Sequence, residues 1–329
     1  MAGTTGESPH HDIPHHGVGE GEVTVTQNTL ERVDSAPPAG RAHDTRPAGP
    51  ALRAAGAALS ILATLLLGFV ATLGPLGDLR HGRDQKVAHS ELREELANAT
   101  APVGPRTADG GQLALGDPVS LLEIKQLGLR EVVAEGTTSD VLAGAPGHRR
   151  DTVLPGQAGV SVVMGRQAAY GGPFAHIDEM RRGETFTVST GQGRHTYRVF
   201  GVRRAGDPQP PVLAEGKGRL TLITGDGSAF LPDGLLRVDA DLVSAVQPAV
   251  APLYSTGSLP ADERPMAGQT SAWVPLVLWG QGLLLAAAAL AWTRARSGRR
   301  EAWVVGIPVL GALGFVVADQ AARLLPNLL

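Results

Sequence analysis

Apolar residues gather in three long runs, and a region of alternating polar and apolar residues lies between the first run and the second. Residues 54–77 carry no charge, and about 24 helical residues at ~1.5 Å each span roughly 36 Å, enough to cross a bilayer. Residues 272–292 and 302–320 form two similar runs. The pattern predicts one N-terminal and two C-terminal transmembrane helices.

Two other interpretations are open. The first run could be a cleaved signal peptide, but it is long and lies about fifty residues into the chain. The other two runs could form a buried soluble hairpin. Trp273, Trp292 and Trp303 lie at the predicted ends of those runs, where amphipathic rings favour the headgroup layer of a membrane, so we favour transmembrane helices.

Positive charge next to the apolar runs predicts the orientation. Residues 293–301 form a short basic loop, which the positive-inside rule places in the cytoplasm. Arg41, Arg46 and Arg53 place the tail 1–53 on the same side. Residues 80–269 would then lie outside the plasma membrane, as would the C-terminal tail 321–329.

The first 53 residues are polar, rich in Gly, Pro and His, and show no lasting period, so we predict a disordered cytoplasmic tail. The tail contains His10, His11, His15 and His16. An unstructured segment cannot preset ligand geometry, so we expect no metal site there and no cofactor elsewhere.

The middle of the chain changes from helical to β-like patterning. Residues 78–117 begin with a short amphipathic helix, Ser90–Ala97, and continue as a linker rich in Pro, Gly and Ala. Residues 118–245 contain short alternating segments between turns, which is typical of a closed barrel or a sandwich. Predicted elements are a hairpin of 185–189 and 195–199 around Gly191-Gln-Gly193, strands at 121–124, 160–164, 220–224 and 236–240, a helix near 174–181, and a linker over 246–271.

The run Leu220-Thr-Leu-Ile-Thr224 is the clearest buried strand of this region, because its β-branched and aliphatic residues suit a pleated surface. The glycine-rich continuation from Gly225 to Ser228 is predicted to end it.

Composition excludes several kinds of chemistry. The net charge is −3, which gives no reason to expect a nucleic-acid partner. The chain contains no cysteine, which excludes disulfides, thiolate metal ligands and a cysteine nucleophile.

A series of short motifs follows in a fixed order over about 120 residues. They are Gly136-Thr-Thr, Gly147-His, Leu154-Pro-Gly, Gly159-Val-Ser-Val-Val-Met-Gly165, Tyr170-Gly-Gly-Pro-Phe174, Gly183-Glu-Thr-Phe-Thr-Val, Tyr197-Arg-Val and Leu220-Thr-Leu-Ile-Thr. In this order the stretch from Leu121 to Val243 resembles the bacterial sortases, particularly the class E type of high-GC Gram-positive bacteria. The resemblance implies an eight-stranded β-barrel and the chemistry of a cysteine transpeptidase, which cuts a sorting signal and joins the protein to a cell-wall amine.

The resemblance also locates the positions where that chemistry would lie. Sortases use a cysteine nucleophile, a histidine that protonates the leaving amine and an arginine that stabilises the oxyanion. Here Gly225 stands at the position of the cysteine, and Arg166, which does not deprotonate in proteins, stands at that of the histidine. Leu235 stands at the position of the arginine. Arg237 lies two residues along on the same strand face and is a candidate substitute, although the alignment could also slip by two residues.

These substitutions predict a catalytically degenerate sortase that binds sorting-signal peptides or surface proteins, or assists an active sortase. Arg166 would then be a fixed cation in the groove, paired with a peptide carboxylate or with Asp226, and Arg237 would be a further groove residue. The first alternative is an enzyme with a hydroxyl nucleophile. The second is that the transmembrane helices carry the function. In the first alternative the nucleophile would be Ser228 or Thr224, and the base would be His148, His176 or His195. In the second alternative Gly306, Gly311 and Gly314 would permit close helix packing.

Overall fold

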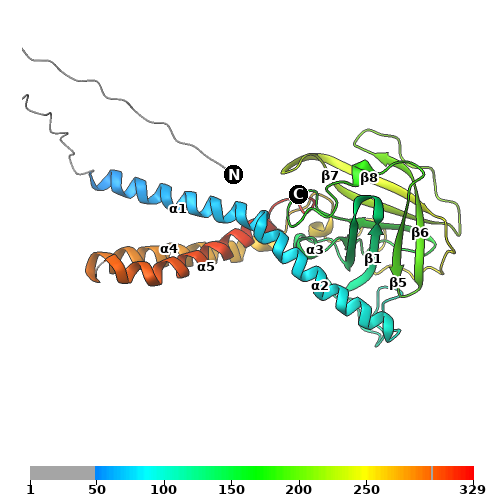
Figure 1. Cartoon of the computed structure of the whole chain (residues 1–329), viewed down its shortest axis with the longest axis horizontal. Helices are drawn as coiled ribbons and strands as arrows, with labels where there is room; N and C mark the ends of the chain where they lie inside the picture. The colour runs from blue at the N-terminus through cyan, green and yellow to red at the C-terminus, as the bar shows by residue number, and fades with distance from the viewer. Residues whose placement is uncertain (1–48, 298) are drawn as a thin grey trace, which may run out of the picture. The chain divides into compact units, whose positions relative to one another are not determined.

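The computed structural model describes residues 49–297 and 299–329, so the tail with its four histidines at positions 10, 11, 15 and 16 lies outside the described residues. Eight strands close into a barrel in the order β1-β2-β3-β4-β7-β8-β6-β5 (Figure 1), which confirms the predicted fold of this region. The strands are β1 (Pro118–Ile124), β2 (Leu129–Glu135), β3 (Gly147–His148), β4 (Gly159–Met164), β5 (Thr185–Thr190), β6 (Gly193–Arg203), β7 (Gly218–Ser228) and β8 (Leu231–Leu242).

Two of the ladders that close the barrel are parallel, β2 with β3 and β4 with β7, and the others are antiparallel. Side chains alternate between the inside and the outside of the barrel, as the period of a strand requires. On β7, Leu220 and Leu222 point inward and are fully buried among Val163 of β4 and Val238 of β8. This interior core holds the barrel together and leaves the intervening residues of each strand on its outer face.

Helices lie outside the barrel (Figure 1). They are α1 (Pro50–Leu73), α2 (Pro75–Ala97), the short α3 (Ser139–Gly144), α4 (Trp273–Ser297) and α5 (Arg299–Arg323). Helix α5 packs against α1 and α4, while α2 packs against α3, β1 and β2. Arg80 of α2 joins the two groups, because its guanidinium lies 3.0 Å from Asp319 of α5 and 3.4 Å from Asp140 of α3.

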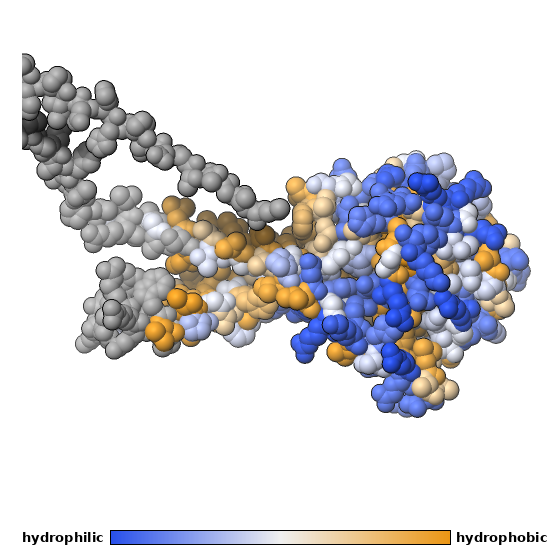
Figure 2. Space-filling view, in the orientation of Figure 1, coloured by the Kyte–Doolittle hydropathy of each residue, from blue (hydrophilic) through white to orange (hydrophobic). Residues whose placement is uncertain are grey.

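Two helical stretches, Ile61–Ala97 and Thr270–Thr293, are long and apolar enough to cross a membrane, judged by length and composition. Figure 2 shows hydrophobic side chains on the surface of the helices and mainly hydrophilic ones on the barrel. The third predicted span, 302–320, lies in the 25-residue helix α5 but is not one of those two stretches. The structure therefore supports two candidate spans and does not confirm the count of three.

Several predicted elements have different bounds. The helix predicted at Ser90–Ala97 is the end of α2, which begins at Pro75. The helix predicted near 174–181 is a single 3-10 turn, Ile177–Glu179. The strand predicted to end before Gly225 continues to Ser228, because Gly225 still pairs with Leu235 across the β7–β8 hairpin. Strands β2 and β3 were not predicted individually from the alternation.

Candidate functional site

The alternation along β7 decides which of its residues face the outside. Leu220 and Leu222 belong to the barrel core, so Thr224 shares their inward face, and its buried hydroxyl has no hydrogen-bond partner in the described part of the chain. Ile223 and Gly225 face outward. Thr224 therefore points away from Gly225, as the sequence predicts.

Gly225 lies on the outer face of the barrel, where three other segments of the chain approach it closely. A Cβ atom added there would lie 3.0 Å from Oε1 of Gln167, 3.0 Å from Cβ of Pro232 and 3.2 Å from the main-chain oxygen of Leu328. The register of β7 and β8 places Leu235 directly beside it. The structure thus brings together Gly225 and Leu235, two of the three positions that the resemblance singles out, and adds Gln167 to them.

Arg166, the third position, turns away from Gly225. Its side chain is 1% exposed beneath α3, where Nε donates to the carbonyl of Leu142 at 3.1 Å and a terminal nitrogen donates to the carbonyl of Ser139 at 2.8 Å. The guanidinium carbon lies 4.8 Å from the ring centroid of Tyr170. Burial lowers the pKa of Arg166 to about 10, so the group stays protonated at neutral pH.

The expected groove cation is therefore a buried structural residue in this arrangement. Asp226 pairs with Arg204 at 3.2 Å, which corrects the expected ion pair between Asp226 and Arg166. Arg166 and Gln167 both lie beyond the end of β4, where the chain leaves the strand, and there Gln167 approaches Gly225 while Arg166 bonds to α3.

Arg237 is partly buried on the same face of β8 as Leu235, opposite Ile223 of β7. Burial lowers its pKa, and the nearby cation Arg203 lowers it further. Arg203 itself pairs with Asp239. Within residues 49–297 and 299–329 no ion-pair partner is found for Arg237, which leaves it as a cation close to the site.

His148 is a buried charged residue and not a free base. Its Nδ1 lies 2.8 Å from Oε2 of Glu135, and its Nε2 lies 3.0 Å from the carbonyl oxygen of Val153. Both partners accept hydrogen bonds, so both ring nitrogens donate and the ring is an imidazolium. Burial by itself would lower the pKa of His148, but the charge of Glu135 and its hydrogen bond outweigh burial and raise it.

The other two candidate bases are also engaged elsewhere. His195 lies 3.2 Å from Oγ1 of Thr190 through Nε2, and burial lowers its pKa. His176 is exposed and pairs with Glu179 at 3.0 Å. Among the described residues neither Ser228 nor Thr224 has a histidine as hydrogen-bond partner.

Residues 324–329, which follow α5 and are here named the tail segment, lie across the site. Asn327 and Leu328 are 0% exposed and Leu329 is 4% exposed. The main-chain N–H of Gln167 donates to the carbonyl of Leu328 at 3.0 Å, and that of Ala169 donates to the main-chain oxygen of Leu329 at 3.2 Å. The sequence does not predict this contact, because a short apolar segment after a long helix carries no signal that it returns to a barrel.

Leu328 packs into a cluster of apolar side chains on the outer face of the barrel, and we name this site the outer groove. The outer groove is lined by Leu142 of α3, Val162 and Met164 of β4, Ile223 of β7, Leu235 of β8 and Met266 of the linker. The first five of these residues belong to the barrel and its helix α3, and Met266 covers Leu328 from the linker. An apolar groove with main-chain donors at its edge can hold an extended peptide.

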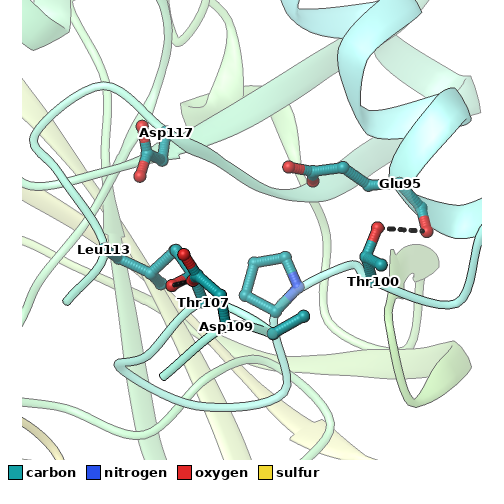
Figure 3. Close-up of a pocket in the computed structure, with 8 residues that line it drawn as sticks. Glu95, Thr100, Thr107, Asp109, Leu113 and Asp117 are labelled. Atoms are coloured by element: carbon teal, nitrogen blue, oxygen red, sulfur yellow. Dashed lines mark hydrogen bonds between the residues drawn. The ribbon is translucent and has the colours of Figure 1, made fainter. Parts of the chain in front are cut away.

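A separate hollow of about 240 Å³ lies between the end of α2 and the loop before β1 (Figure 3). Glu95 and Asp117 line it from opposite sides, and the hydroxyl of Thr100 bonds to the main chain of Glu95. Burial raises the pKa of Glu95, as do the nearby carboxylates of Glu91 and Asp117. The hollow contains no residue of the outer groove. No group of three or more His, Asp or Glu residues in the described part of the chain is arranged to hold a metal ion.

Residues 122–230, which include β7 and Gly225, match the family described as Sortase domain. The matched residues run from β1 to just past the end of β7, so this part of the barrel is similar to a sortase domain. Comparison with curated proteins gives no match.

Solved structures similar to this chain are also sortases. A Clostridium perfringens sortase D5 transpeptidase is 21% identical, with 49% of this chain and 99% of that chain covered and a TM-score of 0.41. Sortase E1 from Streptomyces coelicolor, solved with a tripeptide in the active site, is 24% identical, with coverage of 39% and 90% and a TM-score of 0.36. A sortase from Actinomyces oris is 28% identical, with coverage of 40% and 83% and a TM-score of 0.36.

Proposed function

We propose that this chain is a membrane-anchored sortase-family protein that takes part in cell-wall sorting by binding peptides and not by transpeptidation. The observation that carries the proposal is Gly225, which stands in the outer groove where the family has its cysteine, in a chain with no cysteine at all. A glycine has no side-chain atom that can attack a peptide carbonyl.

The acid and oxyanion roles are also without suitable groups. Arg166 lies beneath α3 and retains its proton, so it does not transfer one to a leaving amine. Leu235 has no polar atom, and Arg237 is the nearby cation on the same strand face. A groove that keeps apolar walls and main-chain donors without these groups supports binding in preference to bond cleavage.

The proposed ligands are a sorting-signal peptide or a surface protein, with an active sortase as a further partner. The proposed arrangement has α1, α4 and α5 as three spans, the tail 1–53 and the loop 293–301 in the cytoplasm, and the barrel outside. Packing of α5 supports it: a Cβ on Gly306 would collide with Leu290 of α4, and one on Gly314 would lie 3.6 Å from Leu65 of α1. Helices that approach this closely are typical of small residues at membrane helix contacts.

The test compares turnover by the full-length protein and by variants, purified in detergent. Each is incubated with a sorting-signal peptide and an amine acceptor, and products are followed by mass spectrometry. We expect no product from the unmodified protein. The variant Gly225→Cys/Gln167→His is the positive comparison, because Gln167 lies beside position 225 whereas Arg166 does not. Gln167→His alone is the matched control without a thiol.

The outcomes separate the functional classes. Transpeptidation by the unmodified protein would show that the enzyme interpretation is right and the binding proposal wrong. Peptide binding without product supports the proposal. The proposal is wrong if a protein whose tail segment has been loosened, as described below, shows no peptide binding and forms no product.

A further inference from the structure

We propose that the tail segment is a built-in peptide ligand of the outer groove, recognised through the pair Asn327-Leu328, and that an outside peptide of the same chemistry enters only when the segment leaves. The inference rests on the proposed peptide-binding function and adds to it the class of ligand and a means of regulation. The ligand class is an extended peptide in which an asparagine precedes a branched apolar residue.

Main-chain carbonyl groups bind the side chain of Asn327. Its side-chain nitrogen donates to the carbonyl of Thr137 at 2.8 Å and to that of Arg264 at 3.0 Å, so both of its protons are used. Its main-chain N–H donates to the carbonyl of Ala267 at 2.9 Å. An aspartate would set a carboxylate against two carbonyl oxygens, and an apolar residue would leave them without this donor. The arrangement therefore selects a side chain that donates two hydrogen bonds, while the side-chain oxygen of Asn327 has no partner among the described residues.

The leucine is read by shape. Leu328 is fully buried in the outer groove, in one apolar cluster with Leu142, Met164 and Ile223. A polar or charged residue in this position would be buried without a partner. The main-chain N–H groups of Gln167 and Ala169 hold the segment by donating to the main-chain oxygens of Leu328 and Leu329.

The segment occupies the reacting position of the family's chemistry. The main-chain oxygen of Leu328 lies 3.2 Å from the place of a Cβ on residue 225. An incoming peptide and the tail segment therefore exclude each other at this point. The tail segment therefore blocks the outer groove when it is bound there.

The segment is also tethered. Arg323 at the end of α5 lies 3.3 Å from Asp140 of α3, and its carbonyl accepts from the main-chain N–H of Gln269 at 2.9 Å. A short tether gives an intramolecular ligand an effective concentration on the order of millimolar, so a free peptide with the same contacts competes weakly. Loosening the tail should therefore convert weak outside binding into strong binding.

The absence of native cysteine makes this occupancy measurable in the full-length protein. Gly225→Cys introduces a single thiol beneath Leu328, and its rate of reaction with N-ethylmaleimide reports how often the segment leaves. We expect a slow reaction with the native tail. The reaction should be about ten- to hundredfold faster after Leu328→Asp, from loss of one buried leucine, and about tenfold faster after Asn327→Ala, from loss of two hydrogen bonds. The new Cβ at position 225 requires its neighbours to shift slightly, and this shift is the same in the proteins with the native tail segment, with Leu328→Asp and with Asn327→Ala.

Ser228→Cys is the matched control, because Ser228 is exposed further along the same strand. Its rate should not change with the tail variants, and denaturant unfolding of each variant shows separately that it is folded. If Gly225→Cys reacts equally fast with all three tails while the Ser228→Cys control is constant, the segment does not occupy the groove and the inference is wrong.

Binding of a labelled peptide, Leu-Leu-Pro-Asn-Leu-Leu, tests recognition separately. We expect at least tenfold tighter binding to the Leu328→Asp protein than to the native one, and weaker binding when alanine replaces asparagine in the peptide. Equal binding of the two peptides would contradict recognition of the asparagine. The turnover assay described under the proposed function tests that function independently. If the thiol at position 225 is shielded by the tail segment but the native protein forms product, the tail segment occupies the groove and the proposed binding role is wrong.

Discussion

Replacing His148 with glutamine removes one member of the buried pair that joins β2 to β3. The ring of His148 and the carboxylate of Glu135 are each 3% exposed, and Nδ1 and Oε2 lie 2.8 Å apart. The substitution leaves the carboxylate of Glu135 buried without its cation. Breaking a buried pair in this way costs about 3–5 kcal/mol of unfolding free energy.

The pH dependence follows from the direction of the pKa shift. The pKa of His148 is raised in the folded protein by Glu135, despite burial, and the more distant charge of Asp151 acts in the same direction. A raised pKa stabilises the fold fully below the unfolded pKa of about 6.5, and the contribution is lost as pH rises through the folded value. The difference in stability between native protein and His148→Gln should therefore shrink as pH rises, by at most about 1.4 kcal/mol per pH unit.

The assay is denaturant unfolding of both proteins in detergent at pH values from 6 to 9. His176→Gln is the matched control, because the side chain of His176 is 72% exposed and its ion pair with Glu179 should contribute little. A difference between native protein and His148→Gln that is the same at pH 6 and pH 9 would refute the charged state assigned to His148.

Two further substitutions test contacts beneath the groove and inside the barrel. Tyr197→Phe should cost about 1–3 kcal/mol in denaturant unfolding, because the buried main-chain N–H of Gly156 donates to the tyrosine hydroxyl and would lose its partner; a loss below the error of the measurement would contradict that bond. Gly165→Ala should cost about 1–3 kcal/mol, because its Cβ would lie 2.6 Å from the ring of Phe174, and restored stability in a Gly165→Ala/Phe174→Leu double variant would confirm the clash as the cause. Val212→Asp, at a side chain that is 96% exposed, should change stability by no more than about 0.5 kcal/mol and serves as the control for both.

Local patterns were sufficient for most of the barrel. The β5–β6 hairpin follows from alternation on both sides of a glycine turn, and β4 and β7 follow from short runs of Val, Ile and Leu. These signals lie within windows of a few residues and need no knowledge of distant contacts. The predicted end of β7 was wrong for the same reason, because local patterns do not show the partner strand. A glycine often ends an isolated strand, but here Gly225 still pairs with Leu235 of β8 and the strand continues.

The sequence by itself determined the apolar runs, the barrel class and the lack of a thiol at Gly225. Only the tertiary structure decided which side chain approaches that glycine, turning Gln167 toward it and Arg166 beneath α3. Only the tertiary structure placed the tail segment in the groove, through contacts such as that of Asn327 with Thr137, which is 190 residues away along the chain. Such contacts depend on how complete elements pack together, and no periodicity within either segment encodes them.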